Sequence, residues 1–341
     1  MRIGLVGYGS GGKHFHAPFI CAAEGLELAG IVARAPETIA RAKADFPDVP
    51  VYPSLAAMLE AGVDIVTITT PPQTRRELVL EAIEAGVAIV ADKPFAPDAH
   101  TGRELADAAK AKGVILSVFH NRRYDADILT VRKVLEQQRV GKLWRFHNRM
   151  DFNDPLTLDG GELGGLLRDL GSHLVDQTLW LLGPVKTVYA HLDIIDHPDG
   201  PTDASFVITL THASGVHSHI SSTKLNRLMS REFILYGEEG SYTSNGTDVQ
   251  AQAIFAGQRP ADDLAAWGYE QQDRWGILRT AEGEEAIPSE QGCYHAYYQA
   301  MAEAVRTGSE PPVTTEQAIR TLEVLDAALL SAKEGRLVTL G

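Results

Sequence analysis

The chain of 341 residues is 44% hydrophobic and 22% charged, which is typical of a folded globular protein and predicts about two domains. Its 31 basic and 45 acidic residues give a net charge of −14, which disfavours nucleic acids and anionic membranes as partners. The N-terminus turns glycine-rich too early for a signal peptide, and no apolar run approaches the ~20 residues of a membrane span. We therefore expect a soluble, cytoplasmic protein.

The first third of the chain alternates short apolar runs with helical patterns. This alternation predicts βαβ units in a parallel, doubly wound sheet of the Rossmann type, with the domain ending near residue 120. Strands are expected at 2–6, 26–33, 63–69, 87–91 and 114–118, with helices beginning at Gly12, Pro36, Ser54, Gln73 and Pro97.

After a helix near 125–138 the pattern changes, because strands now follow one another. We predict an α/β protein whose second domain, 121–341, is α+β with a mostly antiparallel open sheet that serves substrate binding and oligomerisation. One sheet face would be left uncovered, which favours a homodimer or homotetramer through that face. The expected strands are 143–152, 185–195, 204–212, 216–223 and 232–236, and the expected helices are 166–182, 294–306 and 315–334.

A glycine pattern, G-x-G-x-x-G, follows the first strand. Gly7, Gly9 and Gly12 would permit a tight turn, and the backbone N–H groups of this turn, with Ser10 and Gly11, would meet the pyrophosphate of a dinucleotide. Where the second strand ends, NAD-specific folds carry an acid, but this chain carries Arg34. A guanidinium would pair with a 2′-phosphate, so we favour NADP over NAD; stacking of Arg34 on the adenine is the alternative.

Two further strands end in residues placed to face a ligand at the carboxyl edge of the sheet. Thr70 and Pro71 follow one strand, and Asp92-Lys93-Pro94 follows the next. A partly desolvated lysine at position 93 could share a proton with a substrate hydroxyl, although a solvated surface lysine is equally compatible with the tripeptide.

The expected helix 166–182 has a leucine-rich side and a polar side. Asp169, His173, Asp176 and Trp180 share the polar side, because residues three or four apart are neighbours on a helix. Histidine is suited to accept a proton near neutral pH, so His173 is a candidate general base. A structural histidine is the alternative.

We predict no metal site. His217 with His219 and His14 with His16 each lack an evident third ligand, and Cys21 and Cys293, the only cysteines, are expected to be reduced and buried. The aromatic run that begins at Tyr294 would either close a sugar-sized pocket or belong to the core.

Taken together, these motifs resemble the Gfo/Idh/MocA family of glucose-fructose oxidoreductases and inositol dehydrogenases, and more narrowly its NADP-dependent scyllo-inositol dehydrogenase branch. The resemblance spans essentially the whole chain. It rests on the glycine pattern, Thr-Pro-Pro at 70–72, Asp92-Lys93-Pro94 and the run from Asp169 to Asp176, and for the narrower branch on 15–18, 119–125 and 267–269.

The resemblance implies a catalytic trio of Lys93, Asp169 and His173, and a Lys93-Pro94 peptide bond that is cis. Two positions depart from the family: Asp92 replaces a commoner glutamate, and Arg75 stands where many relatives have histidine. Further cofactor contacts are assigned to Thr70, Pro71, Gln73, Asp92, Lys93, His120 and Asn121, and substrate contacts to Lys93, Asn121, Arg122, Tyr124, Asp169, His173 and Tyr294.

The sequence thus predicts hydride transfer between NADP, or else NAD, and a secondary alcohol of a cyclitol or sugar, with a small polyol as the only ligand besides the cofactor. A related enzyme of an aldose or keto-sugar, a nicotinamide-binding regulator without chemistry, and a purely structural partner protein are the alternatives.

Overall fold

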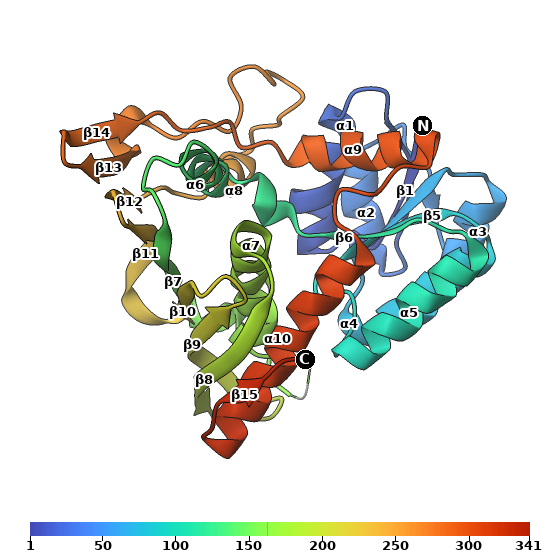
Figure 1. Ribbon diagram of the computed structural model, residues 1–341. Helices are drawn as coiled ribbons and strands as arrows, with labels where there is room; N and C mark the ends of the chain where they lie inside the picture. The colour runs from blue at the N-terminus through green and yellow to red at the C-terminus, as the bar shows by residue number, and fades with distance from the viewer. Residues whose placement is uncertain (162) are drawn as a thin grey trace. The chain divides into compact units, whose positions relative to one another are not determined.

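The computed structural model describes residues 1–161 and 163–341, which form two compact units (Figure 1). The first unit comprises 1–121, 250–267 and 293–319, and the second comprises 122–249, 268–292 and 320–341. Our prediction divided the chain into two consecutive domains, 1–120 and 121–341. The structure instead places two later segments in the first unit, because α9 (Tyr294–Thr307) packs along α1 (Ala17–Ala22).

The first unit contains a six-stranded parallel sheet in the order β3-β2-β1-β4-β5-β6. Its strands are buried along most of their length, which agrees with the apolar runs in the sequence. The predicted parallel, doubly wound sheet is confirmed; β3 was not predicted, since it has only two residues. The strands are β1 (Arg2–Val6), β2 (Glu27–Val32), β3 (Val51–Tyr52), β4 (Ile65–Ile68), β5 (Ala88–Asp92) and β6 (Leu116–Phe119).

Local signals explain where the helices of this unit begin and end. The Ser54 hydroxyl accepts a hydrogen bond from the Ala57 N–H at 3.2 Å, and the Asp98 carboxylate accepts one from the Thr101 N–H at 2.7 Å. Gly113, with φ of 66°, ends α5. The helices are η1 (Gly11–His16), α1, α2 (Pro36–Asp45), α3 (Leu55–Glu60), α4 (Pro72–Glu84), α5 (Ala99–Lys112), α8 (Val249–Phe255) and α9.

The second unit contains a nine-stranded sheet in the order β14-β13-β12-β11-β7-β10-β9-β8-β15. Among the described strand pairs of this sheet only β7–β10 is parallel, so the predicted mostly antiparallel sheet is confirmed. Strands β12–β15 were not predicted: β12, β13 and β14 contain few buried apolar residues, and β15 has only two residues. The strands are β7 (Leu143–Asn153), β8 (Val185–Ile195), β9 (Thr202–His212), β10 (His217–Thr223), β11 (Leu225–Gly237), β12 (Gly240–Ser244), β13 (Gly276–Thr280), β14 (Gly283–Ile287) and β15 (Val338–Thr339).

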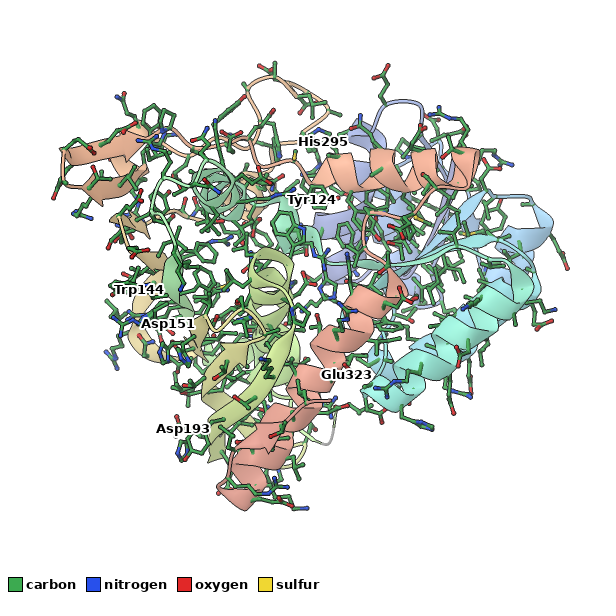
Figure 2. The ribbon with its side chains drawn as sticks, viewed as in Figure 1. Tyr124, Trp144, Asp151, Asp193, His295 and Glu323 are labelled. Atoms are coloured by element: carbon green, nitrogen blue, oxygen red, sulfur yellow. The ribbon has the colours of Figure 1, made fainter. Side chains whose placement is uncertain are left out.

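One face of this sheet is covered by helices. α7 (Ser172–Leu182) packs on β7 and β10, and α6 (Ala126–Glu136) contributes Ile128 and Val131 to a core that includes Phe146 and Phe233. Trp144 at the start of β7 is 55% exposed, and Asp193 near the end of β8 is also exposed (Figure 2). The other helical elements are η2 (Asn121–Tyr124), η3 (Pro155–Thr157), η4 (Leu167–Gly171), η5 (Gln272–Arg274) and α10 (Thr315–Glu334).

The predicted helix 166–182 is divided into two elements. It starts as the π-helical turn η4, continues as α7, and ends before Gly183, which has φ of 76°. Single π-helical turns are often found at functional sites. Among the described residues, no helix combines the length and apolar character needed to cross a membrane.

Candidate active site

The glycine-rich turn in the first unit accepts only glycine at two of its positions. Gly7 has φ of 101°, and a Cβ on Gly12 would lie 2.3 Å from the Gly7 carbonyl oxygen. A Cβ on Gly9, by contrast, would meet nothing within 4 Å. The chain therefore passes from β1 into η1 with its backbone uncovered at Gly9, which lets a ligand approach closely.

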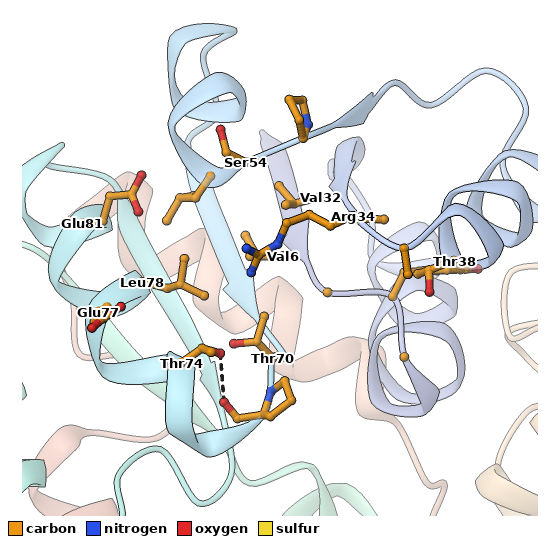
Figure 3. Close-up of a pocket in the computed structure, with 18 residues that line it drawn as sticks. Val6, Val32, Arg34, Thr38, Ser54, Thr70, Thr74, Glu77, Leu78 and Glu81 are labelled. Atoms are coloured by element: carbon orange, nitrogen blue, oxygen red, sulfur yellow. Dashed lines mark hydrogen bonds between the residues drawn. The ribbon is translucent and has the colours of Figure 1, made fainter.

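A cavity of about 740 Å³ lies beside this turn, at the carboxyl edge of the sheet (Figure 3). Figure 3 shows the Arg34 side chain extending across it towards Leu78, with Glu77 and Glu81 of α4 on the far side. The bare glycine backbone, the apolar walls and the guanidinium fit a dinucleotide. Five predicted cofactor residues line the cavity, namely Gly7, Gly9, Arg34, Thr70 and Pro71.

The other predicted cofactor residues lie elsewhere in the first unit. Ser10 and Gln73 are exposed, and Gly12 is buried under the turn. A Cβ on Gly11 would lie 3.3 Å from the Asp92 carboxylate. His120 and Asn121, which follow β6, are 3% and 6% exposed. Their contacts with a cofactor stay predictions.

Lys93 follows β5 and is half-buried, and its backbone N–H donates to the carboxylate of Asp92 at 2.8 Å. Burial alone would raise the pKa of Asp92, but His16, Arg75 and Lys93 outweigh it and hold that pKa at about 2. Asp92 therefore carries a negative charge throughout the neutral range, and it keeps the acceptor that the family's glutamate would supply. The Lys93-Pro94 peptide bond is cis, as the resemblance implies.

Arg75, the departure from the family pattern, connects two loops of the first unit. It is only 4% exposed, and its guanidinium donates to the carbonyl oxygens of Thr70, at 2.7 Å, and Pro94. These carbonyls belong to the loops after β4 and β5, which carry predicted cofactor and catalytic residues. Arg75 therefore holds the backbone at Thr70 and at Pro94, next to Lys93, and does not line the cavity.

A line of buried polar side chains continues from Asp92. His16 Nε2 lies 3.5 Å from the carboxylate of Asp92, and His16 Nδ1 lies 2.5 Å from the hydroxyl of Tyr298 on α9. Both side chains are fully buried. Sequence reasoning treated His16 as loop packing and missed this connection, since the two residues lie 282 positions apart.

Tyr294 requires a correction. Its side chain is 0% exposed and packs edge-on against Phe19, with ring centroids 5.0 Å apart. Its backbone N–H donates to Gln250 at 3.1 Å. Tyr294 is therefore part of the first unit's core, and the prediction that it contacts substrate is not supported.

Cys21, expected to be buried, is exposed.

The second unit contains Asp169 and His173 on successive turns. The η4 turn is held by Asp203, whose carboxylate accepts the Leu167 N–H at 2.6 Å. The Asp169 side chain is 41% exposed, whereas His173 is 6% exposed on α7. The predicted polar side of the helix is thus largely buried: Asp176 is 1% exposed and takes two hydrogen bonds from Arg123, at 2.7 and 2.8 Å.

Lys224, directly after β10, is a site residue that sequence reasoning missed. Its ammonium lies 2.9 Å from the Asp169 carboxylate and 3.0 Å from the Thr157 carbonyl oxygen. No local pattern identifies this lysine, because its partner lies 55 positions earlier on another element.

The short helical turn η2 (Asn121–Tyr124) carries two of the predicted substrate contacts, Arg122 and Tyr124. Arg122 is 9% exposed and donates to Asp248 at 2.7 Å and to Asp125 at 3.3 Å. A polyol contact through Arg122 would compete with these carboxylates, whereas Tyr124 (Figure 2) is partly exposed. Burial, and then the nearby Asp248, raise the pKa of Asp125, although Arg231 opposes them.

Among residues 1–161 and 163–341, no group of three or more His, Cys, Asp or Glu side chains is placed to hold a metal ion. His219, on β10, instead packs edge-on against His147 with ring centroids 4.9 Å apart.

Comparisons with known proteins agree with this geometry. Residues 1–120 match the family described as "Oxidoreductase family, NAD-binding Rossmann fold", and residues 132–340 match its C-terminal alpha/beta domain. The uncharacterized oxidoreductase YdgJ of Escherichia coli is 35% identical over 98% of this chain and 96% of its own length. The scyllo-inositol 2-dehydrogenase (NADP(+)) IolW of Bacillus subtilis is 32% identical over 100% of this chain and 96% of its own length.

A second enzyme and a solved structure are also similar to this chain. The D-apiose dehydrogenase of Paraburkholderia graminis is 28% identical over 93% of this chain and 84% of its own length. The crystal structure of an oxidoreductase from Bacillus cereus superposes with a TM-score of 0.89 at 26% identity, covering 100% of this chain and 99% of that one.

Proposed function

The chain belongs to the Gfo/Idh/MocA oxidoreductase family, and on that premise we propose that it reversibly oxidises a secondary alcohol of a cyclitol or sugar with NADP. The observation that carries the proposal is the cavity beside the glycine-rich turn, where Arg34 stands at the end of β2. The relative named as an NADP-dependent scyllo-inositol dehydrogenase supports the substrate class.

The preference for NADP rests on charge. β2 and its loop bring a guanidinium and no carboxylate to the cavity, while Glu77 and Glu81 come from α4. A 2′-phosphate would form a charge-assisted pair with Arg34, but the 2′-hydroxyl of NAD would not. NAD remains a second cofactor to be tested.

When bound, the nicotinamide supplies the hydride acceptor, and the residues of the chain supply orientation and proton transfer. His173 accepts the hydroxyl proton during oxidation, and Lys93 donates a hydrogen bond to the same oxygen. Asp169 orients the substrate or the histidine, and Tyr124 and Asn121 contact the remaining hydroxyls.

Lys93 and His173 belong to different units, so their cooperation on one oxygen needs a direct test. If both serve that oxygen, the double variant Lys93→Ala/His173→Ala loses less activity than the product of the two single losses. Strictly multiplicative losses would show that the two residues act independently.

An aldose or keto-sugar dehydrogenase is the second candidate, favoured by the 28% identity to a D-apiose dehydrogenase. Parallel assays of inositols and aldoses with NADP and with NAD separate the candidates. We expect the highest kcat/KM for a cyclitol with NADP. Absence of turnover with every polyol and both nucleotides would refute the dehydrogenase and leave a nicotinamide-binding regulator.

A further inference from the structure

Lys224 is a buried cation held beside a candidate catalytic carboxylate in the second unit. Its side chain is 8% exposed, and its ammonium contacts Asp169 and the Thr157 carbonyl oxygen. Two backbone hydrogen bonds fix the main chain at Lys224. Its N–H donates to the Ala204 carbonyl oxygen at 3.1 Å, and its carbonyl oxygen accepts from the Asp154 N–H at 3.1 Å. A buried ammonium is costly unless it is paired, and here the Asp169 carboxylate supplies the opposite charge.

The ammonium has hydrogen-bonding capacity beyond these contacts. It carries three N–H donors, and the Asp169 carboxylate and the Thr157 carbonyl oxygen accept from two of them. The Asp169 side chain keeps 41% exposure, so its carboxylate, which lies against the ammonium, is accessible to a ligand. The two groups therefore present a cationic donor next to an anionic acceptor, 2.9 Å apart.

Adjacent hydroxyls of a polyol match such a pair. One hydroxyl donates to the carboxylate while its neighbour accepts from the ammonium, and each contact is charge-assisted. We propose that Asp169 and Lys224 together bind two adjacent hydroxyls of the substrate, which makes Lys224 a substrate-positioning residue. This inference rests on the proposed function: one of the two hydroxyls is on the carbon next to the carbinol that is oxidised.

This arrangement selects for vicinal polyols. A simple alcohol, or a diol with distant hydroxyls, can form only one of the two charge-assisted contacts, so it should bind more weakly than a vicinal diol.

The test compares two isomeric probes, trans-1,2-cyclohexanediol and trans-1,4-cyclohexanediol. Their Kd values for the full chain with NADP present are measured by ligand-observed NMR, which needs no turnover. The native chain should bind the 1,2-isomer about tenfold more tightly, as expected for one charge-assisted hydrogen bond. Lys224→Met should bind both isomers equally, whereas Lys186→Met, which changes an exposed lysine on β8, should keep the preference.

A second variant guards against misfolding of Lys224→Met. Asp169→Asn alters a partly exposed side chain and leaves no cavity, so it should fold and still lose most of the preference. Equal affinities in the native chain, or a preference that survives in a folded Lys224→Met or Asp169→Asn, would overturn the proposal. A native preference without turnover of any polyol would refute the proposed function while supporting this binding role.

Discussion

The glycine-rich turn of the first unit and the Asp169 region of the second are held by different interactions. Around the turn, backbone meets backbone, and Gly12 is required because a Cβ would lie 2.3 Å from a carbonyl oxygen. Around Asp169, charged side chains from separate elements meet, as in the contact with Lys224. A substitution in the first region should therefore act through packing or ligand approach, and one in the second through charge and proton transfer.

The largest expected effect belongs to the second region. His173→Ala should lower kcat by roughly 10²- to 10⁴-fold, the usual contribution of general acid–base catalysis, while the Kd of NADP stays nearly unchanged. If His173 is the general base, the oxidation rate of the native chain should rise with pH, and this rise should be absent in His173→Ala. Steady-state kinetics over a pH series, with NADP binding by fluorescence titration, measure both. Near-normal kcat with an unchanged pH profile would make His173 a structural residue.

The next effect concerns cofactor choice in the first unit. Arg34→Asp should weaken NADP binding by about 10- to 100-fold and NAD binding far less, because it exchanges a charge-assisted phosphate contact for repulsion. The measurement is the Kd of NADP and of NAD for the native chain and for Arg34→Asp. Equal losses of affinity for the two nucleotides would show that Arg34 contacts a group that both of them carry.

Two alanine substitutions separate packing from ligand approach within one turn. Gly12→Ala should lower the free energy of unfolding by about 1–3 kcal/mol, because backbone must shift to admit the Cβ. Gly9→Ala faces open space, so it should leave stability unchanged and weaken only nucleotide binding. Urea unfolding without nucleotide, followed by titration with NADP, tests the pair. Similar stability losses in both variants would contradict the geometry.

The Asp92 carboxylate makes the stability of the first unit depend on acid pH. Its pKa of about 2 in the folded chain lies below the usual value, so the stabilisation is complete above about pH 4. It should be lost as the pH falls from about 4 to 2, and amount to about 2 kcal/mol. Unfolding at several pH values should show this loss in the native chain and not in Asp92→Asn.

The smallest effect concerns association, which we propose occurs through the uncovered face of the second unit's sheet. Val207 on β9 is 51% exposed, and Val207→Glu should weaken a dimer or tetramer by about tenfold. Phe255→Glu, at a 62% exposed position in the first unit, is the matched control. Light scattering that shows a monomeric native chain at micromolar concentration would exclude the association.

Local spacing was enough to predict the parallel sheet, the glycine-rich turn, and the positions of Lys93, Asp169 and His173 on their elements. These features depend on residues within a few positions of one another, where strand and helix periods and the steric needs of glycine apply directly. Strands β12–β14 were missed although they are as long as β1, because few of their residues are apolar and buried, and β15 has only two residues.

Tertiary structure alone decided which distant side chains meet. The sequence showed that helix 166–182 has a polar side, but not that Arg123 would bury Asp176 or that Lys224 would pair with Asp169. It showed an aromatic run after Cys293, but not that Tyr294 would join the core while Tyr298 reached His16. The physical reason is that each of these charges and hydroxyls has many partners of suitable chemistry along the chain. Packing selects one of them by distance and burial, which no local pattern records.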